Sequence, residues 1–379
     1  MSPTISIILR IHNREEYYKE AINSIVEQNY NKNSLEIIIA TNVIDAVEYL
    51  KQLKDLRYSV SFYKDGTEGE VLYSALKMAT GSIICFLDDD DLWSKDRLLT
   101  VSNAFSKFQN LGYYHNSVLP FKDGKLVEVR KKYETIPKHG NLYVRNLDKS
   151  QGIRKITEYY PDFNMSSISI DKKILINHLE DLKNIITSPD TFLYFCALES
   201  SCDLFLSTDF LTFYRHHDLN LTSNDTKNKK WNNSIMESHE KLLAIFNTKG
   251  TYLEMLILRR LLLTKIQDSL KSNSVSRKAI LKYSGEYLRI LFNFTFSSGF
   301  INGESSEWIN VNSQIYWNYS SLIVIPQSQT GTSGNEIGVA NPQTFNNIFS
   351  HCWVPPWDSS DDGFIGCWTE SNNITITVN

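Results

Sequence analysis

The stretch Ile83-Ile84-Cys85-Phe86-Leu87-Asp88-Asp89-Asp90-Asp91-Leu92-Trp93 is an apolar run that ends in four consecutive carboxylates. A short run of β-branched and aromatic residues is typical of a buried strand in a parallel sheet. We therefore expect it to place its acids at the C-terminal edge of such a sheet, where open α/β sheets bind ligands. Adjacent carboxylates repel one another unless a cation lies among them, and hard oxygen ligands favour Mg²⁺ or Mn²⁺. The alternative interpretation is a solvated acidic turn.

The first hundred residues alternate between strand and helix patterns. Strands are predicted at residues 4–9, 35–40, 58–63 and 82–87, and helices at residues 15–28, 44–53 and 68–79. The third helix is expected to stop at Gly81, and Ser94 is the predicted N-cap of a further helix that runs to about Phe108. This alternation predicts a layered α/β fold with a mainly parallel, Rossmann-like sheet and flanking helices.

The pattern weakens after Gly112 into shorter pieces. Residues 122–125, Lys-Asp-Gly-Lys, predict a hairpin turn. Further strands are expected at residues 165–170, 204–206 and 211–214, a helix at residues 189–198, and a polar loop at residues 224–233.

The composition changes twice in the last part of the chain. Helical patterns dominate up to about residue 296, and five of the seven tryptophans follow residue 297, in a region without Lys or Arg. We expect an α/β domain over residues 1–225, a helical extension over 226–296 and a small Trp-rich β-domain over 297–379. The apolar, basic segment 252–270 fits packing against the first domain, or a membrane surface as the alternative. Whether Cys352 and Cys367 pair is left open.

Composition excludes several classes of protein. The formal net charge of -4 gives no electrostatic argument for nucleic-acid binding. The five cysteines form no C-x-x-C pair, which excludes zinc-ribbon and thioredoxin-like sites. No uninterrupted apolar stretch reaches the roughly 18 residues of a spanning helix, and the start has no signal-peptide pattern. We expect a cytoplasmic protein, with peripheral contact at the inner face of the membrane as a variant of that expectation.

Five segments, in their order along the chain, resemble family 2 glycosyltransferases of the GT-A fold. They are residues 4–8 with 12–17, 21–28, 35–39, 79–93, and 214–217. The resemblance covers about residues 3–220. It implies a metal-dependent, inverting transfer of a sugar from a nucleotide-diphosphate donor, by default a UDP-sugar, to the hydroxyl of a glycan, lipid-linked or protein acceptor. The oligomeric state stays open.

The resemblance assigns roles to the acid run and to a second motif, Tyr-Arg-His-His at residues 214–217. Asp88 and Asp90 correspond to the two acids of the D-x-D motif: Asp90 ligates Mn²⁺ or Mg²⁺, and Asp88 faces the ribose or a bridging water. Asp89 is the spacer, and Asp91 either helps to orient the motif or begins the next turn. His217 is the expected further metal ligand, or else a strand-end histidine bonded to backbone. Arg215 contacts phosphate or forms a scaffold salt bridge.

Asp190 is the candidate catalytic base. The family usually supplies this acid from the first turn of a helix, and residues 188–192, Ser-Pro-Asp-Thr-Phe, occupy that place. An inverting transfer needs a base to take the proton of the acceptor hydroxyl. The alternative is an acid that only interacts favourably with the helix dipole.

The chain departs from the family on the nucleotide side. Thr41 and Asn42 stand where an acid usually contacts the nucleotide base, and Asp65 is a weaker candidate nearby. Residues 10–13, Arg-Ile-His-Asn, replace the usual Pro-Thr-Tyr-Asn, so that Ile11, His12 and Asn13 are the expected donor-binding residues there. The third helix lacks the family's Ala-Arg-Asn, which leaves the nucleotide unidentified.

Two other functions stay open from the residues alone. The first alternative to a glycosyltransferase is a sugar- or nucleotide-binding protein that kept the fold without turnover. The second is a glycan-binding or assembly protein that acts through its Trp-rich end. In the second case exposed aromatic rings would stack on sugars, whereas core tryptophans would have no such role.

Overall fold

A computed structural model describes residues 4–12, 16–53, 57–128, 137, 140–217, 228–246, 251–271, 285, 339–346, 351–353, 366–368 and 373–378. The chain divides into two compact units, residues 1–246 and 247–379. Helix α8 (Asn228–Ile245) falls in the first unit. The domain boundaries expected at residues 225 and 296 stay predictions.

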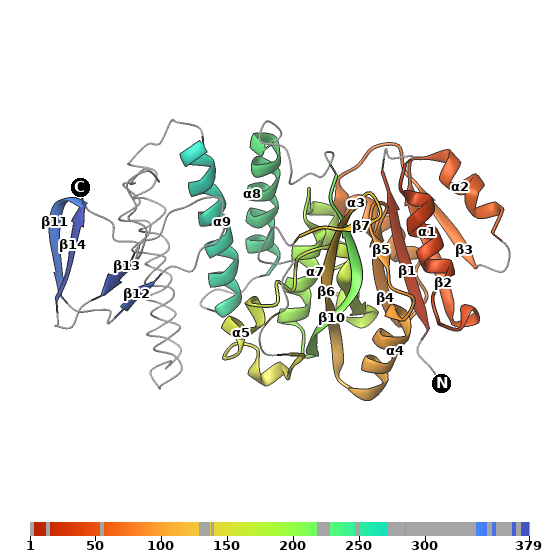
Figure 1. The fold of residues 1–379 in the computed structure, drawn as a ribbon, viewed down its shortest axis with the longest axis horizontal. Helices are drawn as coiled ribbons and strands as arrows, with labels where there is room; N and C mark the ends of the chain where they lie inside the picture. Colours follow the sequence, from red (N-terminus) through yellow and green to blue (C-terminus); the bar gives the residue numbers. More distant parts are fainter. Residues whose placement is uncertain are drawn as a thin grey trace. The chain divides into compact units, whose positions relative to one another are not determined.

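One large sheet forms the centre of the first unit (Figure 1). Its strand order is β3-β2-β1-β4-β9-β6-β10-β5, with β7 beside β6 and β8 beside β10. β1 to β4 run parallel, as do β6 and β10, whereas β9 is antiparallel to β4 and β6. The expected α/β fold with a mainly parallel sheet is confirmed. The strands are β1 (Ile5–Ile11), β2 (Leu35–Thr41), β3 (Tyr58–Phe62), β4 (Ile83–Asp88), β5 (Leu92–Trp93), β6 (Leu111–Lys122), β7 (Lys125–Leu126), β8 (Leu142–Val144), β9 (Ile168–Asp171) and β10 (Asp203–Arg215).

Helices cover the sheet. α3 packs on β1, β2 and β3 and also against α7, whereas α4 packs on β6 and β10. In the first helix Tyr18, Ala21, Ile22 and Ile25, spaced three and four residues apart or adjacent, form a buried apolar face. The helices of this unit, besides α8, are α1 (Tyr18–Val26), α2 (Ile44–Lys51), α3 (Glu68–Met78), α4 (Arg97–Lys107), α5 (Ile153–Thr157), α6 (Lys172–Ile176) and α7 (Pro189–Glu199), with short 3-10 turns at η1 (Lys32–Ser34), η3 (Asn146–Asp148), η4 (Met165–Ser167) and η5 (Asp181–Asn184).

The pleat of β1 separates the core from the site. Successive side chains of a strand point to opposite faces of the sheet. Ile5, Ile7, Leu9 and Ile11 join the hydrophobic cluster formed with α1, α2 and α4. Arg10 therefore lies on the opposite face, the face on which α3 packs.

Three local predictions are wrong. The helix α4 begins at Arg97 after Asp96, not after Ser94, whose buried hydroxyl accepts no hydrogen bond from a helix amide. The two strands expected at 204–206 and 211–214 form the single strand β10, which has bulges near Ser207 and Phe210. Residues 228–233, predicted as loop, begin α8, and residues 218–227 lie outside the described part.

Two turn positions have clear physical causes. Asp123 and Gly124 both have positive φ, 49° and 73°, so the predicted hairpin turn between β6 and β7 is confirmed. The third helix ends at Met78, ahead of Gly81. Gly81 is required by close packing, since a Cβ there would lie 2.6 Å from the Ser6 amide nitrogen.

The second unit contains α9 (Tyr252–Lys271) and two antiparallel strand pairs. β11 (Val339–Asn346) pairs with β14 (Asn373–Val378), and β12 (His351–Trp353) pairs with β13 (Gly366–Trp368). The register of the second pair places Cys352 opposite Cys367. None of the described helices is both long and apolar enough to cross a membrane.

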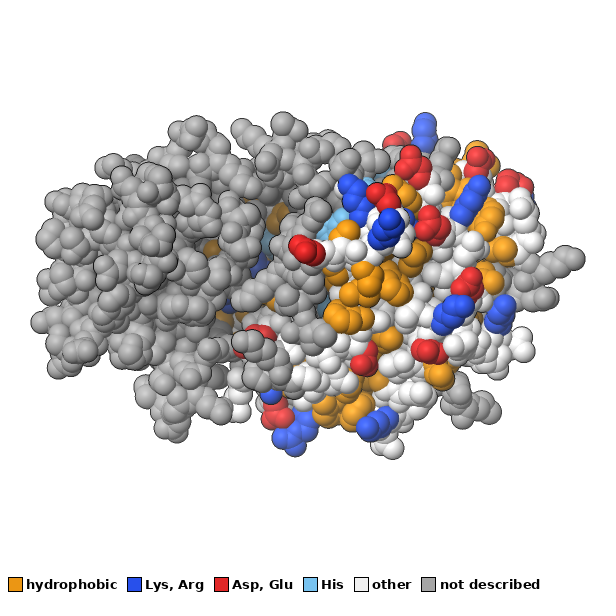
Figure 2. All heavy atoms as spheres, in the orientation of Figure 1, with side chains coloured by type: hydrophobic (Ala, Val, Ile, Leu, Met, Phe, Trp, Pro, Cys, Tyr) orange, Lys and Arg blue, Asp and Glu red, His pale blue; other side chains and the backbone are white. Residues whose placement is uncertain are grey.

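The surface of the first unit carries charges of both signs. Figure 2 shows acidic and basic side chains interspersed over the visible face, with apolar side chains between them. This mixture agrees with the small net charge and gives the described part of that face no extended field of one sign.

Candidate active site

The site forms at the C-terminal edge of the parallel strands. β1 and β4 are parallel neighbours, and their register pairs Arg10 with Asp88. β6 and β10 end at the same edge, which brings Arg215 and His217 toward the acid run. The edge predicted from sequence therefore holds the predicted residues of both motifs.

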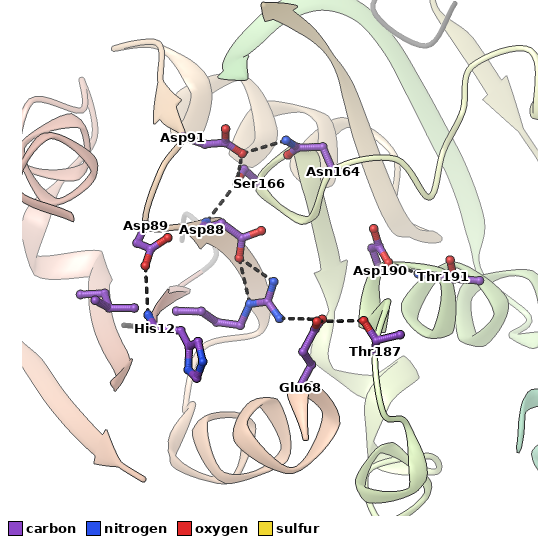
Figure 3. A network of polar contacts seen from close by, with 12 residues as sticks. His12, Glu68, Asp88, Asp89, Asp91, Asn164, Ser166, Thr187, Asp190 and Thr191 are labelled. Atoms are coloured by element: carbon purple, nitrogen blue, oxygen red, sulfur yellow. Dashed lines mark hydrogen bonds and ion pairs between the residues drawn. The ribbon is translucent and has the colours of Figure 1, made fainter. Parts of the chain in front are cut away.

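The four carboxylates divide into two kinds. Asp89 and Asp91 are buried, with exposed fractions of 5% and 2%. Asp89 accepts a hydrogen bond from the His12 amide at 3.0 Å, and so holds the segment after β1. Asp91 accepts from the side chains of Asn164 and Ser166, both at 2.7 Å (Figure 3). It also accepts from the Arg215 amide at 3.1 Å. Burial and the neighbouring carboxylates raise the pKa of Asp91 well above its usual value.

Asp88 and Asp90 are the more accessible pair. Asp88 receives the Arg10 guanidinium, with Nε at 2.8 Å and Nη2 at 2.7 Å from Oδ1. Burial raises the pKa of the Asp88 carboxyl, and the Arg10 charge acts in the opposite direction. Asp90 Oδ2 lies 3.0 Å from His217 Nε2. Among the described residues, no group of three His, Cys, Asp or Glu side chains is arranged to hold a metal ion.

Arg215 is engaged within the protein. Its Nε donates to the Asp90 carbonyl at 2.7 Å, and its Nη2 donates to Glu20 at 2.8 Å. The guanidinium lies between the rings of Tyr17 and Phe121, at 4.5 and 4.4 Å from their centroids. These contacts match the scaffold alternative for Arg215, since they fix the backbone of Asp90.

The nucleotide-side candidates differ in exposure. His12 is exposed, and its ring stacks on that of Tyr63 with a centroid distance of 5.9 Å. Ile11 is buried, and its carbonyl accepts from the Tyr63 hydroxyl. The Thr41 hydroxyl is also buried and accepts from the Val43 amide at 2.8 Å, so it stabilises the start of α2. Asn42 is partly buried, Asp65 is exposed, and Asn13 lies outside the described residues.

Asp190 lies in the first turn of α7, after Ser188, which has a left-handed φ of 56°. The Thr191 amide donates to Asp190 Oδ1 at 2.8 Å. Burial, with the nearby Asp162 carboxylate, raises the pKa of Asp190 to about 7. A carboxyl with this pKa exchanges protons near neutral pH, as a general base requires.

A chain of contacts links Asp88 to the segment that leads into α7. Arg10 Nη1 lies 3.4 Å from Glu68 Oε2, and the Thr187 hydroxyl donates to Glu68 Oε1 at 2.9 Å. Figure 3 shows this chain running from Asp88 toward the end of the helix that carries Asp190. These contacts thus connect Asp88 to Thr187, three residues before Asp190.

Sequence reasoning missed Arg10, Glu68, Asp162 and Asn164. Arg10 had a signal, since it is the one charge in the apolar stretch of residues 4–11. Glu68 opens a helix with a Thr67–Glu70 capping box, a recognisable start pattern. Asp162 and Asn164 lie in an irregular segment whose neighbours in space could not be read from its own residues.

Comparisons with known proteins identify the family of this chain. Residues 6–194 match the model of a family described as glycosyl transferase family 2. An uncharacterized glycosyltransferase of Nostoc sp. is 26% identical over 117 residues, which cover 30% of this chain and 36% of that protein. Staphylococcus aureus TarS, a poly(ribitol-phosphate) beta-N-acetylglucosaminyltransferase, is 28% identical over 122 residues, 31% of this chain and 20% of TarS. The chain therefore spans less than half the length of either relative.

A third relative and one structure extend the comparison. An uncharacterized glycosyltransferase of Haemophilus influenzae is 24% identical over 247 residues, which cover 63% of this chain and 90% of that protein. The crystal structure of S. aureus TarS aligns with 96% of this chain and 60% of the TarS chain, with a TM-score of 0.50 and 13% sequence identity. This likeness supports a shared fold and nothing further. With the matched segment spanning β1 to the middle of α7, the chain belongs to glycosyl transferase family 2, and its first unit is a glycosyltransferase domain of the GT-A type.

Proposed function

We propose that this chain transfers a sugar from a nucleotide-diphosphate donor to an acceptor hydroxyl with inversion at the anomeric carbon. The observation that carries the proposal is the arrangement at the sheet edge. The accessible acid Asp88 ends β4, and Asp90 follows it in the next turn. Arg10, Glu68 and Thr187 connect Asp88 to the segment before Asp190.

In this reaction the acceptor oxygen bonds to the anomeric carbon while the bond from that carbon to the phosphate oxygen breaks. Asp190 takes the proton of the acceptor hydroxyl, and the nucleoside diphosphate leaves with the bonding electron pair. A base with a pKa of about 7 is half ionised at neutral pH and still binds the proton well.

The residues present fit a divalent cation that arrives with the donor. Protein sites for such cations often combine one or two protein ligands with phosphate oxygens of the substrate. Asp90 and His217 offer a carboxylate and an imidazole 3.0 Å apart, and phosphate oxygens would complete the ligand set. Bound there, Mn²⁺ or Mg²⁺ would neutralise the charge that develops on the leaving diphosphate.

Donor identity is the first point to test. The family resemblance makes a UDP-sugar the default, and N-acetylglucosamine is the first sugar to try, because it appears in the name of TarS. The test is a panel of nucleotide sugars with Mn²⁺, read by thermal stabilisation, since a ligand bound to the native state raises the melting temperature. Transfer assays with the donor that this panel identifies would then distinguish three classes of acceptor: a glycan, a lipid-linked sugar or a protein.

Three variants separate turnover from binding. We expect Asp90→Asn and Asp190→Asn to lower donor hydrolysis or transfer at least 100-fold, whereas the exposed Asp45→Asn keeps wild-type activity. Asp90→Asn should also lose the Mn²⁺-dependent stabilisation by donor, and Asp190→Asn should keep it. If the wild type binds the donor without any turnover, the chain is instead a sugar- or nucleotide-binding protein that kept the fold without catalysis.

A further inference from the structure

Thr191 joins two carboxylates at the N-terminus of α7. Its amide donates to Asp190 Oδ1 at 2.8 Å, and its hydroxyl donates to Asp162 Oδ2 at 3.2 Å. Thr191 is 6% exposed, so the link is shielded from water. One residue therefore sets the positions of both acids.

The segment that carries Asp162 is anchored on both sides of it. The Tyr113 hydroxyl donates to the Pro161 carbonyl at 2.5 Å, and His115 Nε2 lies 2.9 Å from the Phe163 carbonyl. The Asn164 side chain donates to Asp91 at 2.7 Å. These contacts hold Asp162 from β6 and from the acid run, so its placement is built into the fold.

Backbone strain gathers at the same place. Tyr160, Asn164 and Ser188 have positive φ values of 46°, 66° and 56°. A non-glycine residue in this region costs on the order of 1 kcal/mol and persists where its surroundings hold it, often at functional sites. Two of the three flank Asp162, and the third precedes Asp190 by two positions.

The charged and titratable groups that act on Asp190 come from four parts of the unit. They are Arg10 from β1, Glu68 from α3, Tyr113 from β6, and Asp162 from the segment before η4. After burial, Asp162 is the strongest of the influences that raise the pKa of Asp190, and Arg10 acts against it. A like charge disfavours ionisation of its neighbour and so makes it a stronger base.

We infer that Asp162 is a positioning residue for the transfer reaction: through Thr191 it orients the Asp190 carboxylate, and its negative charge strengthens Asp190 as a proton acceptor. The inference rests on the proposed function, in which Asp190 is the base. Asp162 itself does not touch the reacting atoms in this scheme.

The test is the pH dependence of kcat for donor hydrolysis by the full chain. In Asp162→Asn we expect the acidic limb to move about one unit to lower pH, because Asp190 without the neighbouring charge ionises earlier. We expect kcat on the plateau above that limb to fall about threefold or more, because the weaker and less well oriented base accepts a proton less well. KM for the donor should change less than twofold. Thr191→Val should lower kcat, and Thr191→Ser, which keeps the hydroxyl, should restore it.

A second measurement holds even if Asp162→Asn does not fold. Carboxyl ¹³C NMR titration of the wild type and of Asp190→Asn should show Asp162 titrating about one unit lower in the variant, since coupling between two acids is reciprocal. An unchanged Asp162 titration overturns the inference, as does a wild-type acidic limb in folded Asp162→Asn. If Asp190→Asn keeps full activity, Asp190 is not the base, and both the proposed function and this inference are refuted. If Asp190→Asn is inactive and the Asp162 results are wild-type, only the inference falls.

Discussion

Replacing Arg10 with methionine should reveal how strongly the first unit depends on one ion pair. The change removes the cation between Asp88 and Glu68 and keeps an unbranched apolar stem. In the variant, Asp88 would stay at the sheet edge without its partner. Because Arg10 lowers the pKa of Asp88 in the folded protein, the variant should also bind a proton at Asp88 more readily.

The magnitude follows from the burial of the pair. The side chains of Arg10 and Asp88 are 18% and 25% exposed. Removing one partner of a fully buried pair costs about 3–5 kcal/mol, and a fully exposed pair contributes about 0.2–1 kcal/mol. We expect a loss of about 2–3 kcal/mol in the free energy of unfolding, which lowers the melting temperature of a domain of this size by roughly 4–12 °C.

A double-mutant cycle measures the interaction itself. Thermal and urea unfolding of Arg10→Met, Asp88→Asn and the double variant should give a coupling energy of about 1.5–2.5 kcal/mol. The matched control is Lys51→Met, which breaks the Lys51–Glu48 pair of equal 2.7 Å separation but with side chains 56% and 57% exposed. That control should lose little or no stability, because water screens an exposed ion pair. A coupling energy below about 0.5 kcal/mol would refute the reasoning.

Three further predictions concern the frame around the site. Lys149→Met should lower the free energy of unfolding by about 2–4 kcal/mol in urea denaturation. The Lys149 Nζ donates to the carbonyls of Ala197 and Ser200 at the end of α7, both at 2.7 Å, and these carbonyls would lose a buried partner. A loss under about 1 kcal/mol would contradict this prediction. Gly81→Ala should lower the free energy of unfolding by about 1–3 kcal/mol in the same assay, because the added Cβ would clash with the backbone of β1. An unchanged urea midpoint would show instead that β1 shifts to accommodate the Cβ. Burial lowers the pKa of His115 from 6.5 to about 4, so between these values the unfolded chain binds a proton that the folded chain does not. The stability from neutral His115 is therefore complete above pH 6.5 and lost as the pH falls to 4, by at most about 3 kcal/mol; His115→Gln, which can still donate to Phe163, should remove this part of the acid dependence in unfolding measured at pH 7 and pH 4.5.

The sequence predicted most of the frame because the signals are local. The apolar run before Asp88 has the length of one strand, and the period of the first helix reveals its buried face. The main errors arose where tertiary contacts overrode a local preference. Ser94 has the chemistry of an N-cap, yet its buried hydroxyl bonds to no helix amide. The bulges of β10 interrupt the pattern of one long strand, so that it reads as two short ones.

The sequence by itself determined the α/β class, the position of the acid run and the resemblance to family 2 glycosyltransferases, since each depends on residues adjacent along the chain or on their order. Only the tertiary structure decided which of the four acids are buried, that Arg10 pairs with Asp88, and that Asp162 and Asp190 share Thr191. Arg10 and Asp88 are 78 positions apart, and Asp162 and Thr191 are 29 apart. Such contacts follow from strand order, register and backbone strain, which local propensity does not encode.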